Sequence, residues 1–396
     1  MKKLCVLLCI YLFHFIANAQ TKTIYAFDLV NGTTDSITSI AFDTSIVSDT
    51  TRYFTGTFNS NIENLNQNLP VTNVYPNTNF AFKRQASLDY DLNKYPIRTS
   101  VKIFNIHNDT VGGLCSGSLI SRKHVLTAAH CVSRVNTNIL FVDSLMVAPV
   151  YDNGTFNSNF NSSYVNKIFV FKDWRISGED LAILELNQNI GASTGWLSIG
   201  FNKVDSVLSN GTFYKFSYPG TTLLHIDSNH YNGDSLYYNY GKIDIVDSLF
   251  IGINGTSGIP GESGSSLIKI VNNQTYTTYG ALTYANGLRH SKINNREFYV
   301  FQHIIANDLT TVPPVIPENG DYVIYPNPTV NSFKIRSANR QSSMDVLLYD
   351  QVGKLIKSQT AIGVDQDIDI SQLSNGVYFI KIISEGQSTT KKIIKN

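Results

Sequence analysis

The chain has 396 residues, more than one compact domain usually contains, so roughly two or three folding units are expected. Hydrophobic residues make up 42% of the sequence and charged residues only 15%, a balance that excludes a largely disordered protein. The formal net charge is +1 with the charges mixed along the chain, so neither a basic stripe for nucleic acid nor an acidic tail is indicated.

Residues 1–19 have the pattern of a secretory signal peptide. Lys2 and Lys3 supply the positive start, Leu4 to Ile16 is apolar, and Ala17 to Ala19 forms a small-x-small cleavage motif. The alternative is a membrane anchor, but the apolar stretch is shorter than the ~20 residues of a spanning helix. The sequence therefore predicts an exported protein with no stable membrane span.

Residues 20–84 are rich in Asn, Thr, Asp and Ser. They contain only short apolar alternations, such as Thr23 to Phe27. No long helical periodicity appears, so the segment fits either a small β unit or a pro-segment.

Strand-like runs dominate from about residue 95 onward, separated by Gly, Asn and Asp turns. Tyr and Phe number 22 each, and such residues suit half-buried pleated surfaces. The runs are Val101–Phe104, Ser118–Ser121, His124–Thr127, Lys167–Phe171, Leu181–Leu186 and Tyr279–Tyr284. The pattern predicts an all-β barrel or sandwich.

The segment from Glu297 to Leu309 breaks this pattern. Its apolar residues recur at helical spacing and form one face, made of Phe298, Phe301, Ile304, Ile305 and Leu309. Three prolines follow between Thr310 and Gly320, and they suit an extended linker because proline cannot continue a helix. We therefore expect a linker at residues 311–320 and a second strand-rich unit at residues 321–396.

Three short segments carry candidate catalytic residues. They are Gly113–Ser121 continuing into Val125–Cys131, then Glu179–Leu184, then Gly261–Leu267. A serine hydroxyl is a poor nucleophile, so a neutral imidazole must accept its proton as the new bond forms. A buried carboxylate must fix the tautomer of that imidazole and stabilise its charged form. Each segment alone has an ordinary structural explanation, but His130, Asp180 and Ser263 together indicate acyl transfer.

In these segments the sequence resembles the trypsin/chymotrypsin family of serine peptidases, in its bacterial branch. That family carries Cys-x-Gly-Ser-Leu-Ile, Leu-Thr-Ala-Ala-His-Cys, Asp-Leu/Ile-Ala-Leu and Gly-Asp-Ser-Gly motifs, with its catalytic residues in the order His, Asp, Ser. The resemblance covers about residues 85–310. It implies a chymotrypsin-like double β-barrel closed by a C-terminal helix. It also implies a secreted serine endopeptidase that cleaves proteins or peptides through an acyl-enzyme, without a cofactor.

The resemblance assigns a role to each motif residue. His130 is the general base, Asp180 its carboxylate partner and Ser263 the nucleophile, and the amides of Gly261 and Ser263 form the oxyanion hole. Glu262 departs from the family, which usually has Asp there. The alternative is a catalytically silent surface binding protein, an adhesin on the same fold, and the complete set of catalytic residues favours the enzyme.

The implied specificity pocket has Ser257 at its floor, six residues before the nucleophile, with Thr283 and Tyr284 beside it. A neutral floor cannot pair with a Lys or Arg side chain, so trypsin-like cleavage is not expected. Leu282 stands where glutamate-selective relatives carry histidine, which argues against glutamate selectivity.

Once the leader is removed, Cys115 and Cys131 are the cysteines that remain, because Cys5 and Cys9 lie within it. One pair of cysteines in an exported protein predicts a disulfide. The resemblance implies that this disulfide pins the loop bearing His130. No metal site is expected, because structural zinc takes four ligands and no Cys or His cluster completes a set.

The last unit carries a second resemblance. Pro-Asn-Pro within Tyr325–Thr329, the run Val346–Lys354, Gly-Val-Tyr within Asp369–Phe379 and the Lys391-Lys392 ending are similar to the C-terminal sorting domain of the type IX secretion system. This implies a small β-sandwich that the secretion machinery reads. The protein would then pass through the periplasm and outer membrane to the cell surface or medium. The alternative is a carbohydrate-binding or adhesive β-sandwich, which no exposed-aromatic pattern favours.

These resemblances make a pro-segment the leading interpretation of residues 20–84, because such peptidases are commonly exported inactive. Lys83-Arg84 lies near the family's activation cleavage, although a basic pair is also ordinary surface charge. Cleavage there would release an ammonium group that pairs with Glu262 and orders the oxyanion loop. In the competing interpretation local hydrogen bonds hold Glu262, and the segment only assists folding.

Overall fold

The computed structural model of the chain describes residues 23–37, 45–58, 62–65, 80, 83–107, 110–133, 144–172, 174–221, 231–254, 257–272, 275–284, 288–308, 322–325, 329, 331–336, 343–350, 353–363, 366–384 and 387–395. The predicted signal peptide and the predicted linker lie outside the described residues. The chain divides into two compact units, Met1–His303 and Ile304–Asn396. None of the helices in the described ranges is long and apolar enough to cross a membrane.

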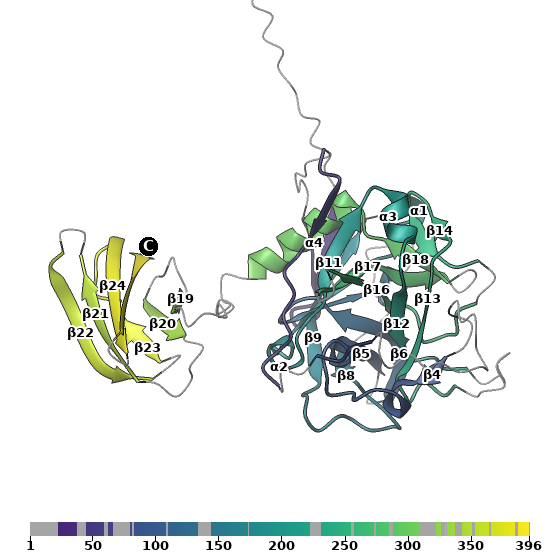
Figure 1. The fold of residues 1–396 in the computed structure, drawn as a ribbon, viewed down its shortest axis with the longest axis horizontal. Coiled ribbons are helices and arrows are strands. Elements are labelled where there is room, and N and C mark those ends of the chain that lie inside the picture. The colour runs from purple at the N-terminus through teal and green to yellow at the C-terminus, as the bar shows by residue number, and fades with distance from the viewer. Residues whose placement is uncertain are drawn as a thin grey trace, which may run out of the picture. The chain divides into compact units, whose positions relative to one another are not determined.

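A closed β-barrel forms the first half of the larger unit (Figure 1). Its strands are hydrogen-bonded in the order β10-β7-β6-β5-β8-β9, and β9 pairs back with β10. They are β5 (Ser100–His107), β6 (Thr110–Leu119), β7 (His124–Thr127), β8 (Ser144–Pro149), β9 (Ser163–Phe171) and β10 (Ala182–Leu186). All four residues of β7 and all but one of β10 are buried. β7 ends shortly before His130 and β10 begins shortly after Asp180, so the barrel supports these two segments.

A second sheet, in the order β14-β15-β18-β17-β16-β12-β13-β4, forms the other barrel, and β11 pairs with β17. The strands are β4 (Arg84–Gln85), β11 (Ser198–Asn202), β12 (Phe213–Ser217), β13 (Tyr237–Gly241), β14 (Ile245–Val246), β15 (Phe250–Gly252), β16 (Ser266–Val271), β17 (Thr275–Tyr284) and β18 (Arg289–Lys292). Short helical turns connect the strands: η1 (Ala86–Leu88), η2 (Ile97–Thr99), η3 (Ala129–Cys131), α1 (Trp174–Ser177), α2 (Gly191–Thr194) and α3 (Asp205–Ser209). The predicted all-β architecture of two barrels is confirmed.

The described part of residues 20–84 adds strands to both barrels. β1 (Ile24–Asp28) pairs with β9 and with β2 (Thr33–Ile37), and β3 (Ser48–Thr50) pairs with β11. Ile24 and Phe27 of β1 are buried. The segment is therefore built into the peptidase unit and does not form a separate one.

The Lys83-Arg84 pair, predicted near an activation cleavage, does not lie on an exposed loop. Arg84 belongs to β4, which pairs with β13, and its Nε lies 2.7 Å from Asp89 Oδ2. The Lys83 side chain is buried. Proteases need accessible and locally mobile backbone, so pairing of this strand disfavours cleavage here, and the activation cut stays a prediction.

One longer helix, α4 (Asn295–Asp308), closes the unit as predicted, starting two residues earlier than expected. Glu297 Oε2 accepts from the Asn294 amide at 2.9 Å, which satisfies a backbone donor at this start. Phe298 packs on Phe201 at 5.1 Å between ring centroids, and Phe301 packs on Phe171 at 6.0 Å. Leu309, the predicted last residue, lies outside the described part.

The C-terminal unit consists of two small sheets. One contains β19 (Val323–Tyr325), β20 (Ser332–Arg336) and β23 (Asp367–Asp369), and the other contains β21 (Met344–Tyr349), β22 (Leu355–Ile362), β24 (Gly376–Ser384) and β25 (Gln387–Lys395). β21 alternates strictly between buried and half-buried residues. Side chains of both sheets, including Phe333, Val346 and Ile380, share one apolar core. This is the predicted β-sandwich.

Candidate active site

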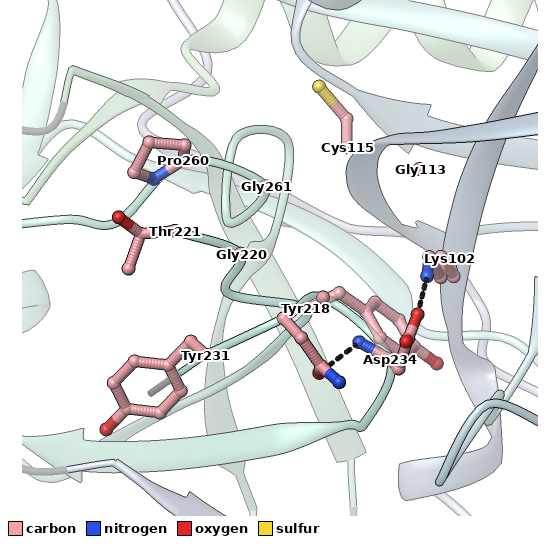
Figure 2. A pocket seen from close by; sticks show the side chains of 12 residues that line it. Lys102, Gly113, Cys115, Tyr218, Gly220, Thr221, Tyr231, Asp234, Pro260 and Gly261 are labelled. Atoms are coloured by element: carbon pink, nitrogen blue, oxygen red, sulfur yellow. Dashed lines mark hydrogen bonds and ion pairs between the residues drawn. The ribbon is translucent and has the colours of Figure 1, made fainter. Parts of the chain in front are cut away.

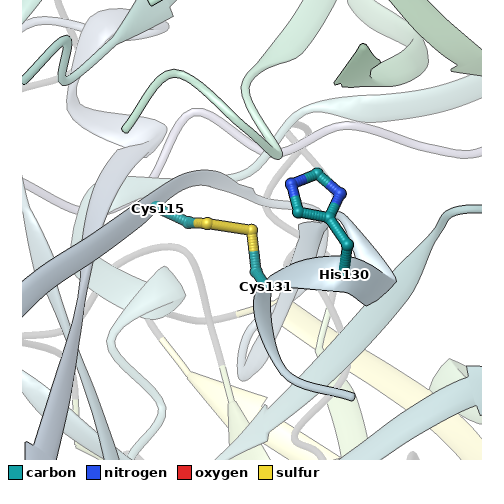
Figure 3. Close-up of side chains that lie close together, drawn as sticks. All are labelled: Cys115, His130 and Cys131. Atoms are coloured by element: carbon teal, nitrogen blue, oxygen red, sulfur yellow. A yellow bond between two sulfur atoms is a disulfide. The ribbon is translucent and has the colours of Figure 1, made fainter. Parts of the chain in front are cut away.

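The segment that carries His130 is held by a disulfide. β7 ends at Thr127, and His130 lies in the short turn η3, where Cys131 is bonded to Cys115 of β6 (Figure 3). The predicted disulfide is therefore confirmed. The two sulfurs and a His130 nitrogen lie within 4.8 Å of one another, but sulfurs bonded to each other cannot act as thiolate metal ligands.

Asp180 contacts His130 twice. His130 Nδ1 lies 2.6 Å from Asp180 Oδ2, and the His130 backbone amide donates to Asp180 Oδ1 at 2.8 Å. Asp180 is buried just before β10, while the imidazole is half-buried. A carboxylate at Nδ1 favours the tautomer with its proton there, which leaves Nε2 as the proton acceptor.

Thr283, predicted to lie in the specificity pocket, contacts Asp180 in the structure. Its hydroxyl donates to Asp180 Oδ2. The β17–β18 register shifts between Leu282 and Tyr284, so Thr283 is the extra residue of a bulge. Bulges re-aim side chains beside active sites, and this one directs a buried hydroxyl to the carboxylate. Thr283 thus supports Asp180, a role with no signal in the sequence, and its place in the specificity pocket stays a prediction.

Ser263 lies in the turn between β15 and β16, and its loop is seated against the segment that leads to His130. The Ser116 amide donates to the Ser263 carbonyl at 2.8 Å, and the Gly264 amide donates to the Leu282 carbonyl at 2.8 Å. Gly264 has φ +82°, and a Cβ there would strike the Thr127 hydroxyl and the Ser116 carbonyl and lie 3.0 Å from the Ala128 amide nitrogen. The close contact with the residues before His130 therefore requires glycine.

The backbone amides of Gly261 and Ser263 flank Glu262 in this loop. Gly261 has φ +86°, and an added Cβ would strike the Tyr218 carbonyl. Its own carbonyl accepts from Ser116 Oγ at 2.8 Å, and the Glu262 amide donates to Ile259 at 3.1 Å. Within the described ranges, neither the Gly261 nor the Ser263 amide donates to a protein acceptor. Both remain available for a developing negative charge.

A cavity of about 650 Å³ adjoins Gly261 (Figure 2). Its lining includes Cys115 of the disulfide, Pro260 and an ion pair in which Lys102 Nζ lies 3.2 Å from Asp234 Oδ1. Burial lowers the pKa of Lys102, and the hydrogen bond that Lys102 donates to Asp234 opposes that shift. The cavity therefore joins the proposed oxyanion loop to the disulfide beside His130.

The other two predicted pocket residues are both exposed. Ser257 is at the surface, and the Tyr284 ring packs edge-on against Phe250 at 5.5 Å between centroids. Residues 255–256 and 285–287, next to these two positions in the chain, lie outside the described residues. A specificity pocket formed by Ser257 and Tyr284 stays a prediction.

A buried pair of carboxylates lies beside Asp180. Arg296 contacts Glu179 and lies 2.9 Å from Glu297 Oε1, and Ser177 Oγ donates to Glu179 Oε2 at 2.7 Å. Burial raises the pKa of Glu297 to about 7; the Arg296 charge opposes this rise and the Glu179 charge adds to it.

Because this pKa is raised on folding, protonation of Glu297 stabilises the folded chain. The contribution is complete below the unfolded pKa of ~4.3 and is lost as pH rises through about 7. We expect Glu297 to make the free energy of unfolding fall by ~2 kcal/mol between pH 5 and pH 8. The variant Glu297→Gln should lack this contribution to the pH dependence. Urea unfolding across this range measures it. Glu185→Gln, which removes a carboxylate 3.1 Å from Lys123, is the control and should keep the full slope.

Comparison with protein families matches residues 90–301 to the family described as Trypsin, and residues 323–396 to the Secretion system C-terminal sorting domain. Among curated proteins, Serine protease 23 of Mus musculus is 40% identical over 78 residues, covering 19% of this chain and 18% of that protein. Glutamyl endopeptidase of Bacillus licheniformis is 27% identical over 191 residues, covering 46% of this chain and 57% of that protein.

Chymotrypsin-C of Mus musculus is 33% identical over 105 residues, covering 26% of this chain and 36% of that protein. The chain thus spans no more than 57% of the length of these curated relatives. The solved structure titled Glu endopeptidase in complex with MPD has a TM-score of 0.46 and 19% identity, and the match covers 57% of this chain and 97% of that chain.

Proposed function

The chain belongs to the Trypsin family, which matches 90–301, and from this premise we propose that it is a secreted serine endopeptidase. Ser263 is the nucleophile, His130 the general base and Asp180 the carboxylate that orients the base. The double contact of Asp180 with the ring and backbone of His130 carries the proposal. That contact fixes the imidazole with Nε2 free to accept a proton.

In the proposed reaction Ser263 Oγ attacks the peptide carbonyl carbon while His130 Nε2 takes the hydroxyl proton. The amides of Gly261 and Ser263 donate to the oxyanion. The carbon–nitrogen bond then breaks, and His130 returns the proton to the leaving amine. Water, deprotonated by His130, attacks the acyl-enzyme, and the proton passes to Ser263 as the acid departs.

The cavity beside Gly261 supports cleavage within a chain rather than at its end. It lies between the oxyanion loop and the Cys115–Cys131 disulfide next to His130, where the leaving amine must stand. Residues of the substrate that follow the cleaved bond would occupy it. Thr283 and Tyr284 are not part of its lining.

Active-site labelling tests the proposal. A biotinylated fluorophosphonate should modify the full-length protein once, on Ser263, as located by peptide mass spectrometry, and should abolish casein hydrolysis. His130→Ala should prevent the labelling. The alternative, an adhesin on the same fold, requires a folded protein that neither reacts nor cleaves casein, and that result would remove the enzyme proposal.

The C-terminal unit is proposed to act as the sorting signal that the type IX secretion system recognises, in line with its family match. Deleting residues 321–396 is expected to leave the peptidase in the periplasm, because its strands and core are separate from those of the barrels. Immunoblots of periplasm, cell surface and medium measure this. The control fuses residues 321–396 to a periplasmic reporter, which should then leave the cell. Wild-type amounts of the truncated protein in the medium would contradict the prediction.

A further inference from the structure

The side chain of Glu262 lies beneath the loop that carries the two proposed oxyanion donors. Glu262 stands between Gly261 and Ser263, and its side chain is 0% exposed. A buried carboxylate stays ionised only where cations and hydrogen-bond donors replace water. The partners of this carboxylate therefore decide how firmly the loop is held.

Both oxygens of Glu262 have partners from outside the loop. Oε1 lies 2.5 Å from Lys215 Nζ and accepts from Ser217 Oγ at 2.9 Å, both from β12. Oε2 accepts from the Ile259 amide at 2.7 Å and lies 3.6 Å from Lys83 Nζ. The side chains of Lys83 and Lys215 are themselves almost fully buried. Two ammonium groups from distant parts of the chain thus face one carboxylate.

The electrostatics favour an ionised carboxylate at this position. Burial alone would raise the pKa of Glu262, but the ammonium groups of Lys215 and Lys83 bring it down to about 2. Burial lowers the pKa of Lys215 to about 8, and Glu262 opposes this shift. His290 also lies near this pair, and burial and the Lys215 charge lower its pKa to about 3, so it is neutral. Two cations and one anion leave an excess of positive charge below the oxyanion loop, which favours the transition state.

We propose that Lys215 and Lys83 are positioning residues that act through Glu262. By holding its carboxylate, they keep the amides of Gly261 and Ser263 in the orientation that binds the oxyanion. This inference rests on the proposed function, because an oxyanion forms only if Ser263 attacks a carbonyl.

The inference gives the N-terminal segment a place in the working enzyme. Lys83 precedes β4, so a cut after Arg84 would detach it from the strand that positions it. In the activation hypothesis drawn from the sequence, that cut releases a new N-terminus, whose ammonium pairs with Glu262 and switches activity on. The observed contacts favour the internal lysines, because Glu262 is already paired in the uncut chain.

Kinetics of full-length variants separate positioning from folding. Lys215→Met should lower kcat per labelled active site by about 10²–10³-fold, with KM nearly unchanged, as for loss of an oxyanion donor. Affinity for a peptide boronic acid, whose adduct places an oxyanion in the hole, should fall by a similar factor. Lys83→Met should lower kcat and boronate affinity on the order of 10-fold each, because Lys83 lies farther from Glu262 than Lys215 does. Lys83→Arg keeps the positive charge and should restore kcat and boronate affinity. Lys292→Met removes another buried lysine, 3.3 Å from Asp205, and should leave kcat unchanged.

Mass spectrometry of the fluorophosphonate-labelled wild-type enzyme completes the test. Labelled protein should retain Lys83. Lys83→Met keeps the contacts of Glu262 with β12, so it tests the inference even if Lys215→Met does not fold. Wild-type kcat and wild-type boronate affinity in Lys83→Met would overturn the inference. A labelled enzyme that begins at Gln85 or later would also overturn it. Failure of the wild type to label at Ser263 has a different meaning, since it overturns the proposed function itself.

Discussion

Ser263→Ala is expected to lower kcat by about 10⁶-fold while the protein folds normally. The alanine lacks the hydroxyl that forms the acyl-enzyme, and what remains is the weaker assistance of the oxyanion hole and of substrate binding. The small, half-buried side chain makes no hydrogen bond within the described part of the structure, so the fold loses nothing when it is removed. Hydrolysis of a peptide substrate, with circular dichroism as the check on folding, measures both.

A double-variant comparison sharpens this result. If Ser263 and His130 act as one unit, as proposed, His130→Ala and the double variant should each lose about as much as Ser263→Ala alone. Ser248→Ala, at an exposed turn of the second barrel, is the matched control and should retain wild-type kcat. Losses that multiply in the double variant, or retained turnover by Ser263→Ala, would mean that the two residues do not form one catalytic unit.

The sequence predicts the parts of this site that depend on short segments. The Leu-Thr-Ala-Ala-His-Cys run combines a buried strand, a turn and a cysteine, so the placement of His130 beside the disulfide follows from local pattern. The same holds for the apolar run after Asp180, which forms β10. The Pro-Asn-Pro and Gly-Val-Tyr signals predict the C-terminal sandwich through the sorting-domain family that they resemble.

Contacts between distant strands are not visible in the sequence. Thr283 contacts Asp180 because β17 contains a bulge at this residue. The residue pattern around Thr283 does not predict that bulge. Lys215 reads as one polar residue in an apolar strand, yet its ammonium is buried against Glu262. The N-terminal strands β1 and β3 read as an isolated polar segment, because the barrel strands that they pair with occur more than 100 residues later.

Asp180→Asn is expected to lower kcat by about 10⁴-fold with little change in KM. Asp180 accepts from the ring Nδ1 and from the backbone amide of His130, and it also accepts from Thr283. An asparagine can present its amide N–H to Nδ1, which moves the imidazole proton to Nε2. The His130 Nε2 then points a proton at Ser263 and cannot accept one, so nucleophilic attack is blocked while substrate binding is not.

Steady-state kinetics and the rate of fluorophosphonate labelling should show this loss to the same extent, because both depend on removing the Ser263 proton. Asp244→Asn is the matched control: it changes an exposed aspartate of the second barrel whose Oδ1 accepts from the Asn254 amide at 2.8 Å, and it should keep wild-type rates. A loss of less than about 10-fold in Asp180→Asn would mean that the tautomer of His130 is fixed by another group. Equal losses in kcat and in substrate affinity would instead point to a disturbed loop, since orientation of the base acts on the chemical step alone.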